Sequence, residues 1–182
     1  MTTIWNTHSE GLFWHVCEER LGYDIQKISE SQAPSPDYEI HADGIRIVAE
    51  VKELSDNAKS CEIQNALEEP GHIHIDTVDF EFTGALDRVL RKQERQLAAE
   101  SRSGTPTLGV IYVGRFLGPT EYQIRHQLRR GAVSIPSAIS AIMLMKHSGI
   151  MAEETPTPLY LIFCNPNATV IWPVDIFPEI FA

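Results

Sequence analysis

Three charged residues between Pro36 and Lys52 have types and a spacing that could do chemistry. Asp37 follows a proline, twelve residues intervene, and Glu50-Val51-Lys52 then stands within an apolar run. Side chains alternate along a strand, so we expect Glu50 and Lys52 on one face and Val51 on the other. Two carboxylates beside an ammonium could hold a hard divalent metal ion with a cation next to it. The pattern therefore indicates metal-assisted chemistry.

A β-hairpin is the element that must bring these residues together. Ala42-Asp43-Gly44 is typical of a tight hairpin turn of the Asp-Gly type. The flanking residues predict two antiparallel strands, over Tyr38–His41 and Ile45–Leu54. Such a turn would fold the first strand back on the second and bring Asp37 near Glu50.

Length and composition limit the class of protein. The 182 residues are 43% hydrophobic and 22% charged, which is typical of a globular chain with a core of its own. The net charge of -10 opposes long-range attraction of nucleic acid, so such an interface requires a local cluster of cations. We expect no membrane span, because no apolar run reaches roughly 18 residues, and no signal peptide, because Met1–Trp5 lacks the basic and apolar regions of one. Three separated cysteines indicate reduced thiols, and together these features favour a cytoplasmic protein.

The rest of the chain predicts a mixed α/β domain. Apolar periodicity and breaker residues predict elements on both sides of the hairpin. Before it we expect a helix over Ser9–Leu21 and a strand over Tyr23–Ile28. After it we expect a polar excursion over Ser55–Pro70, a strand over His72–Phe82, a helix over Leu86–Glu100, a strand over Leu108–Val113, helices over Pro119–Arg130 and Pro136–His147, and strands over Tyr160–Cys164 and Thr169–Trp172.

The Pro36-Asp37 and Glu50-Val51-Lys52 segments, placed on two strands after a helix and a strand, resemble the PD-(D/E)XK nuclease superfamily. This superfamily is also called restriction-endonuclease-like, and its core runs helix, three strands, helix, strand. The resemblance implies an α/β fold with a single nuclease-like domain over residues 1–182. Its core would occupy about 8–115, and a C-terminal helical and β-hairpin extension would occupy about 116–182.

The resemblance also implies roles for the motif residues. Asp37 and Glu50 would bind Mg²⁺ or Mn²⁺ together with the main-chain carbonyl of Val51. Lys52 would orient or help to deprotonate the attacking water and would stabilise charge near the phosphate. The absence of His and Cys from this set favours Mg²⁺ or Mn²⁺ over zinc.

Two helices supply further candidates. Many members of the superfamily add an acid from the first helix, and Glu10 is preferred here over its rivals Glu18 and Glu19. Many also have a Lys, Arg or Gln on the second core helix facing the site. Gln93 lies in the middle of the apolar side of its helix, an unusual place for an amide without a buried partner. It is the candidate there, with Gln96 as the alternative.

Other interpretations of these residues stay open. The motif residues could form a solvated ion pair on a strand face. Gln93 could be a hydrogen-bonded core amide. The strand His72-x-His74-x-Asp76 offers three potential ligands, but an exposed strand face explains it equally. One helix has a basic side that could be its solvated face or could follow a phosphate backbone, with more cations after it. This basic side comprises Arg88, Arg91, Lys92 and Arg95, and the later cations are Arg102, Arg125, Arg129 and Arg130.

The expected function is Mg²⁺-dependent hydrolysis of phosphodiester bonds, with DNA as the expected nucleic acid. A non-catalytic nuclease-fold module for binding or assembly is the alternative, and the acidic net charge motivates it. A chance match in an unrelated α/β protein is a further one. The apolar segments Ile139–Met145 and Val174–Phe181 could bury in a homodimer or against a partner protein, but core packing explains them equally well.

Overall fold

The computed structural model describes most of the chain, in six segments. These are residues 7–29, 34–54, 83–113, 121–147, 158–173 and 176–177. Two sequence-based predictions, the polar excursion over Ser55–Pro70 and the strand over His72–Phe82, lie outside the described residues, as does Cys61.

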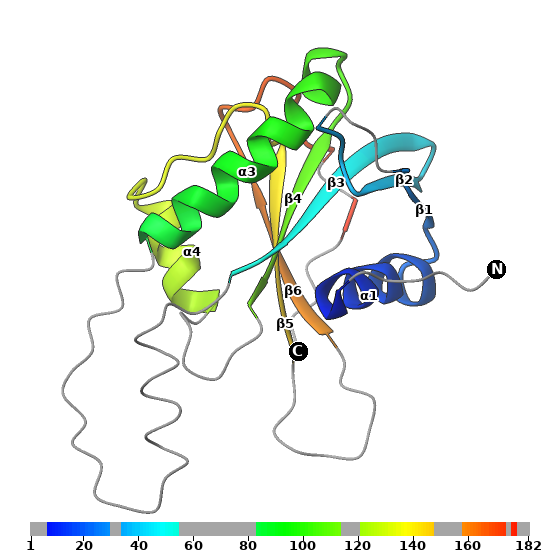
Figure 1. The fold of residues 1–182 in the computed structure, drawn as a ribbon, viewed down its shortest axis with the longest axis horizontal. Helices are drawn as coiled ribbons and strands as arrows, with labels where there is room; N and C mark the ends of the chain where they lie inside the picture. The colour runs from blue at the N-terminus through cyan, green and yellow to red at the C-terminus, as the bar shows by residue number, and fades with distance from the viewer. Residues whose placement is uncertain are drawn as a thin grey trace, which may run out of the picture.

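The described residues form a mixed α/β fold around one six-stranded sheet (Figure 1). The sheet order follows the chain order from β1 to β6. Strands β3, β4 and β5 run parallel, and the other three neighbouring pairs of strands are antiparallel. The elements are α1 (His8–His15), the π-helical turn η1 (Val16–Arg20), β1 (Asp24–Lys27), β2 (Tyr38–Ala42), β3 (Ile45–Glu53), α3 (Thr83–Arg102), β4 (Thr107–Val113), α4 (Glu121–Arg129), β5 (Ala141–His147) and β6 (Pro158–Cys164).

Helices cover both faces of the sheet. Leu86, Leu90 and Leu97 of α3 share one buried cluster with Ile124 and Leu128 of α4. The two helices therefore lie over the same face, as expected when two successive parallel crossovers have the same hand. On the opposite face, α1 and η1 bury an apolar side against the sheet. That side comprises Phe13, Val16 and Cys17.

The predicted hairpin is confirmed. Strands β2 and β3 pair antiparallel with Tyr38 opposite Ala49. The turn residues Asp43 and Gly44 have φ angles of 50° and 79°. Positive φ at both central positions is what a two-residue turn needs to match the twist of its strands, and Asp-Gly tolerates it. This local geometry fixes the register that brings the start of β2 to the middle of β3.

Two sequence-based predictions beyond β4 are wrong. The helix expected over Pro136–His147 is a strand, because Ala141–His147 forms β5 between β4 and β6. A strand buried on both faces is apolar at every position, and its pattern cannot be told from a buried helix. The segment Thr169–Trp172 is not a strand. Instead β6 pairs with β5, so the last two strands continue the same sheet.

The start of β5 is held by a pair of buried hydroxyls. The main-chain amide of Thr107 donates to Oγ of Ser140 across 3.1 Å, and the amide of Ser140 donates to Oγ1 of Thr107 across 3.0 Å. Both side chains are fully buried or nearly so. This reciprocal pair ties the first residue of β4 to the residue before β5, a tertiary contact that a local helical pattern does not reveal.

The remaining predicted elements are confirmed, with shifts at their ends. Helices appear as α1 with η1, α3 and α4, and strands appear as β1, β4 and β6. In the part of the chain that the structure describes, no helix has the length and apolar character of a membrane span.

Candidate active site

Asp37, Glu50 and Lys52 meet at the open end of the β2–β3 hairpin. Asp37 is the residue before β2, and its main-chain amide donates to the main-chain oxygen of Ala49 across 3.1 Å. This pairing continues the hairpin ladder by one residue and sets Asp37 opposite Glu50. Lys52 lies two residues further along β3, on the same face of the strand as Glu50.

Each of the two carboxylates accepts a hydrogen bond from the other residue's strand. The main-chain amide of Asp37 donates to Oε2 of Glu50 across 3.1 Å. The main-chain amide of Val51 donates to Oδ2 of Asp37 across 2.9 Å. Hydrogen bonds to carboxylates are among the stronger ones in proteins. The hairpin backbone thus fixes both carboxylates before any ligand arrives.

The ammonium of Lys52 bridges the two acids. Its Nζ contacts Oε1 of Glu50 directly and lies 3.8 Å from Oδ2 of Asp37. The side chain of Glu50 is fully buried, whereas those of Asp37 and Lys52 are 25% and 31% exposed. The cluster therefore begins in the protein interior and reaches solvent through Asp37 and Lys52.

Burial and the neighbouring Lys52 act in opposite directions on the pKa of Glu50. Burial and the neighbouring charge of Asp37 raise the pKa of Glu50 to about 7, although Lys52 favours its ionised form. Burial opposes the charge of Lys52, but its hydrogen bond to Glu50 and the charges of both carboxylates raise the pKa of Lys52. Lys52 is accordingly a cation at neutral pH, whereas Glu50 ionises only near neutral pH because its negative charge is poorly solvated.

Glu10 lies in the first turn of α1, on the sheet side of that helix. Oγ1 of Thr7 caps the helix by accepting from the main-chain amide of Glu10 across 3.3 Å. The carboxylate of Glu10 accepts from Nζ of Lys27 at 2.8 Å and from the hydroxyl of Tyr38 at 3.1 Å, both at Oε2. Its charge is also one of those that raise the pKa of Lys52.

The rival acids of the first helix point elsewhere. Glu18 accepts a hydrogen bond from Nε1 of Trp14, and Oε2 of Glu19 lies 3.0 Å from Nδ1 of His15. Both acids are exposed on η1. Of the three helix acids, Glu10 is the one whose charge raises the pKa of Lys52.

Sequence reasoning did not single out Lys27 or Tyr38 as neighbours of Glu10. Lys27 ends β1, and its Nζ also lies 5.9 Å from the centre of the Tyr38 ring. Tyr38 directly follows the motif aspartate, and its ring is fully buried. A polar residue at an inward position of a short strand is the signal that could have marked each of them.

Gln93 lies on the sheet side of α3 and is fully buried. Its Nε2 donates to the main-chain oxygen of Glu50 across 3.0 Å and to that of Val110 across 2.8 Å. Its Oε1 has no hydrogen-bond partner within the described part of the chain. The side chain thus binds the backbone of β3 and β4 at the level of the candidate site. The alternative, Gln96, is half-buried.

The donor atoms suit a hard divalent cation. The carboxylates of Asp37 and Glu50 and the carbonyl of Val51 are oxygen donors, which Mg²⁺ and Mn²⁺ prefer. Across the described residues, no group of three or more His, Cys, Asp or Glu side chains could hold an ion. A magnesium site needs only one or two protein carboxylates. The pair fits such an ion, and Glu10 as a third ligand stays a prediction.

The comparisons with known proteins assign no family. No protein-family model and no curated protein matches the chain. Among solved structures, SfsA from Pyrococcus furiosus, in complex with Ca²⁺, is similar at a TM-score of 0.35 and 14% sequence identity. The match covers 81% of this chain and 59% of that one, so this chain spans less than two thirds of its length. This likeness is too low to support any argument about function.

The fold and the candidate site together describe the class of this protein. The described chain is a mixed α/β protein with a six-stranded sheet. Two carboxylates and a lysine meet at the open end of its first hairpin.

Proposed function

We propose that this protein is a metal-dependent nuclease that hydrolyses phosphodiester bonds, with DNA as its substrate. The observation that supports the proposal is the meeting of Asp37, Glu50 and Lys52 at one end of the β2–β3 hairpin. Two acids fixed by backbone hydrogen bonds, with a lysine beside them and solvent on one side, suit a metal-assisted attack on a phosphodiester.

Asp37, Glu50 and the carbonyl of Val51 would hold Mg²⁺ or Mn²⁺. Such an ion, when bound, neutralises phosphate charge and lowers the pKa of water. The poorly solvated carboxylate of Glu50 supports this assignment, because a buried charge is costly unless a cation offsets it.

Lys52 would act chiefly as a fixed positive charge. A lysine with a raised pKa keeps its proton at neutral pH, so it can stabilise negative charge that develops on a phosphate. Gln93 would hold the strand that bears Glu50, through the hydrogen bond to the Glu50 carbonyl.

A cleavage assay tests the proposal. Purified protein is incubated with supercoiled circular DNA and with linear DNA, in Mg²⁺, Mn²⁺ or EDTA. We expect cleavage that requires the metal and falls by at least about 100-fold in Asp37→Asn and Lys52→Ala, because each removes a group acting on the reacting phosphate. Asp24→Asn, an exposed aspartate on β1, is the matched control. If cleavage persists in Asp37→Asn or Lys52→Ala, the roles assigned to these residues are wrong.

A non-catalytic module with this fold is the second candidate. The ion pair between Lys52 and Glu50 favours it, because that pair partly neutralises the acids without any metal. The acidic net charge of -10 favours it as well. Metal binding measured by calorimetry, without cleavage of DNA or RNA under any of the conditions above, would select this candidate.

A further inference from the structure

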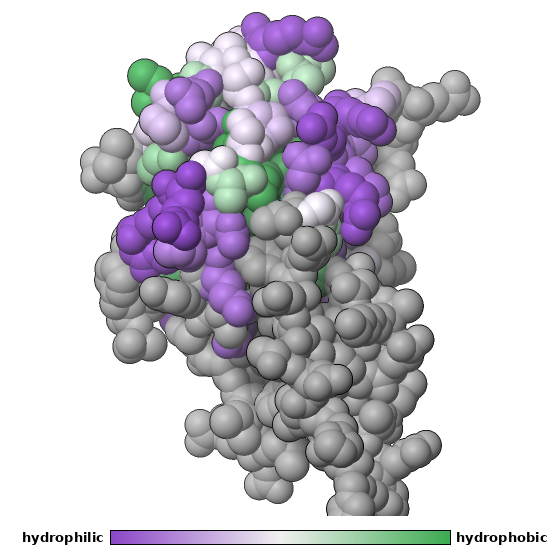
Figure 2. Space-filling view, turned by 90° about the vertical axis from the view of Figure 1, so that its left-hand side faces the viewer, coloured by the Kyte–Doolittle hydropathy of each residue, from purple (hydrophilic) through white to green (hydrophobic). Residues whose placement is uncertain are grey.

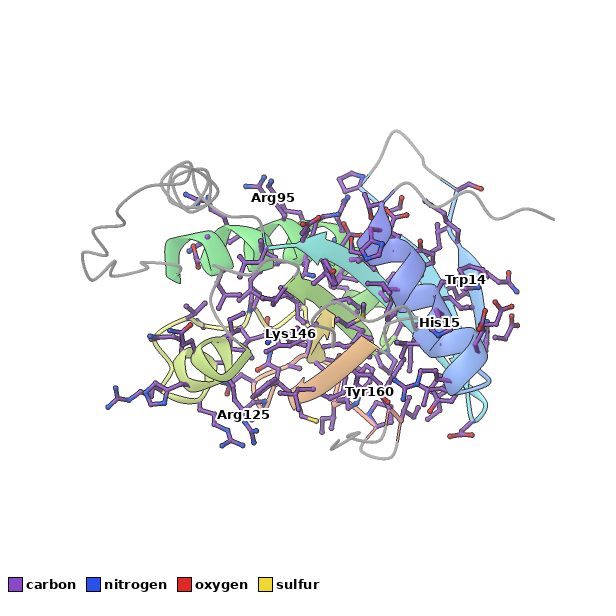
Figure 3. All side chains as sticks on the ribbon, turned by 90° about the horizontal axis from the view of Figure 1, so that it is seen from below. Trp14, His15, Arg95, Arg125, Lys146 and Tyr160 are labelled. Carbon is purple, nitrogen blue, oxygen red and sulfur yellow. The ribbon has the colours of Figure 1, made fainter. Side chains whose placement is uncertain are left out.

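The outward side of α3 is mostly basic. Among the residues of this helix whose burial the structure describes, seven are exposed and five of these are Lys or Arg, and the side chain of Asp87 is 42% exposed beside them. Arg95, one of them, extends from α3 away from the sheet (Figure 3). The five are Arg88, Arg91, Lys92, Arg95 and Arg102, and we call them the α3 basic stripe.

The charges of Asp87 and Glu94 both act on Arg91, but the acids of α3 form no ion pair with the rest of this stripe within the described residues. Arg91 pairs with Asp87 across 2.7 Å. Glu100 is half-buried and pairs with Arg46 of β3 across 2.8 Å. Among the residues that the structure describes, no ion pair is formed by the other four stripe residues. Most of the stripe therefore presents uncompensated positive charge to solvent.

Cations are concentrated on the two helices that cover this face. Residues 83–102 and 121–130 contain eight Lys and Arg against four Asp and Glu, a local charge of +4. The whole chain has 15 Lys and Arg and a net charge of -10. More than half of the cations thus lie in these two short segments. The second segment adds Arg129 and Arg130, which are exposed at the end of α4.

The views of the molecule show where these two helices lie. In Figure 1, α4 and the beginning of α3 lie on the same side of the sheet and at the same flank of the molecule. Figure 2 looks at that flank, and strongly hydrophilic residues form several patches over its described surface. Figure 3 shows Arg95 of α3 and Arg125 of α4 extending to opposite sides of the molecule, so the α3 basic stripe is a surface of its own.

The spacing of the stripe costs helix stability. Arg88 and Lys92 are four residues apart, as are Arg91 and Arg95, and Lys92 and Arg95 are three apart. Like charges at these spacings destabilise a helix by roughly 0.2–0.5 kcal/mol a pair. If this face served only solubility, a mixture of positive and negative side chains would stabilise the helix better. The repeated cost suggests that a polyanion offsets the repulsion.

We propose that the outward side of α3 binds the phosphate backbone of a nucleic acid. The choice of nucleic acid rests on the proposed function. From Arg88 to Arg102 the stripe is roughly 21 Å long at about 1.5 Å a residue. That length corresponds to about six nucleotides of one strand at roughly 3.4 Å each. A local surface of this kind recruits DNA to a chain that is acidic as a whole.

Binding without catalysis tests the inference. The anisotropy of a fluorescent 20-base-pair DNA duplex is followed against the full chain in EDTA, over a series of salt concentrations. The triple variant Arg88→Gln/Lys92→Gln/Arg95→Gln should bind roughly 10-fold or more weakly near 0.1 M salt. Its logarithmic salt slope should fall by about 2 to 3, since each lost phosphate contact removes about 0.9. Glutamine is a good helix former, so the variant should fold.

Two controls separate the stripe from the net charge. Arg88→Lys/Arg95→Lys keeps both charges and should keep the slope. Arg20→Gln removes one exposed cation from η1, which packs on the face of the sheet opposite to α3. This variant should change binding much less than Arg95→Gln does. The inference is overturned if the wild type does not bind the duplex, if the triple variant binds as the wild type does, or if Arg20→Gln weakens binding as much as Arg95→Gln.

Failure of this inference can be told from failure of the proposed function. Lys52→Ala should abolish cleavage, whereas the triple variant of the stripe should weaken binding in EDTA, where no cleavage occurs. If the wild type binds DNA through the stripe but shows no metal-dependent cleavage, the proposed nuclease function is refuted and the binding surface is not. Metal-dependent cleavage by a protein whose DNA binding does not depend on the stripe refutes this surface alone.

Discussion

Gln93 donates a hydrogen bond of 3.0 Å from its Nε2 to the main-chain oxygen of Glu50. Its other amide atom, Oε1, lies against Gly109 of β4, where a Cβ atom would come within 2.8 Å of it. Gly109 is also the residue of β4 that pairs with Glu50 of β3. The absence of a side chain at Gly109 therefore allows α3 to approach the two strands that support the candidate site.

Gly109→Ala should destabilise the protein by roughly 1–3 kcal/mol, because the new methyl group would overlap the Gln93 amide in a packed interior. The penalty should shrink in a Gln93→Ala background, where the overlapping atom is absent. The free energy of unfolding in urea gives the coupling between the two positions as a double-mutant cycle.

Gly84→Ala is the matched control for that cycle. Gly84 is exposed on the same helix, and a Cβ built on it meets nothing within 4 Å. Because alanine favours helix over glycine, this variant should be neutral or gain up to about 1 kcal/mol. A cycle in which the Gly109→Ala penalty does not depend on Gln93 would contradict the close approach.

Glu50→Gln should remove a pH-dependent cost from the folded state. The pKa of Glu50 is raised from 4.5 to about 7 by burial and by the charge of Asp37. A carboxyl whose pKa is higher in the folded state than in the unfolded state makes its full contribution to stability below the unfolded-state pKa. That contribution is lost as pH rises through the folded-state pKa. Between about pH 4 and pH 8 in EDTA, the stability of Glu50→Gln relative to the wild type should therefore rise, by roughly 2–4 kcal/mol.

Glu39→Gln should show the opposite trend and serves as its control. Burial opposes ionisation of Glu39, but hydrogen bonds from His41 and Arg46 prevail and lower its pKa. Its contribution is present above the unfolded pKa and is lost as pH falls through the folded one. Urea unfolding at several pH values measures both variants. A stability difference for Glu50→Gln that does not change with pH would contradict the buried-carboxylate argument.

Local chemistry made part of this molecule predictable from its sequence. The Asp43-Gly44 turn determines where β2 and β3 reverse, and the alternation along β3 then sets Glu50 and Lys52 on one face. The motif residues could be placed near one another because only one turn separates them. Gln93 could be noticed because an amide in an apolar stripe needs a buried partner.

Contacts between distant segments were not predictable. Glu10 meets Lys27 and Tyr38, which lie 17 and 28 residues away in the sequence, and no periodic pattern specifies such pairs. The strand β5 has a sequence that fits a buried helix equally well. It is a strand because it pairs with β4 and β6, and a local sequence pattern holds no information about those partners.

Tyr38→Phe should cost roughly 1–2 kcal/mol of stability, because it removes a buried hydrogen bond to the carboxylate of Glu10. Tyr112→Phe is the comparison. Tyr112 is also buried, but its hydroxyl makes no hydrogen bond within the described residues. That variant should stay within about 0.5 kcal/mol of the wild type. Equal costs for the two variants would mean that the Glu10 contact contributes nothing measurable.

Divalent metal should stabilise the protein in a way that depends on Asp37. If Asp37 and Glu50 hold Mn²⁺ or Mg²⁺, the folded state gains about 2.7 kcal/mol when the free ion is at 100 times its dissociation constant. For a domain of this size that gain raises Tm by roughly 5–10 °C. Asp37→Asn should lose most of this rise in Tm, whereas Asp24→Asn should keep it.

The rise in Tm should also depend on pH. A bound cation offsets the poorly solvated charge of Glu50, so the rise should be larger at pH 8 than at pH 5.5. Calorimetric unfolding with and without EDTA makes the measurement without any substrate. A shift of equal size in Asp37→Asn and in the wild type would place the ion elsewhere, and the metal role of the hairpin carboxylates would be wrong.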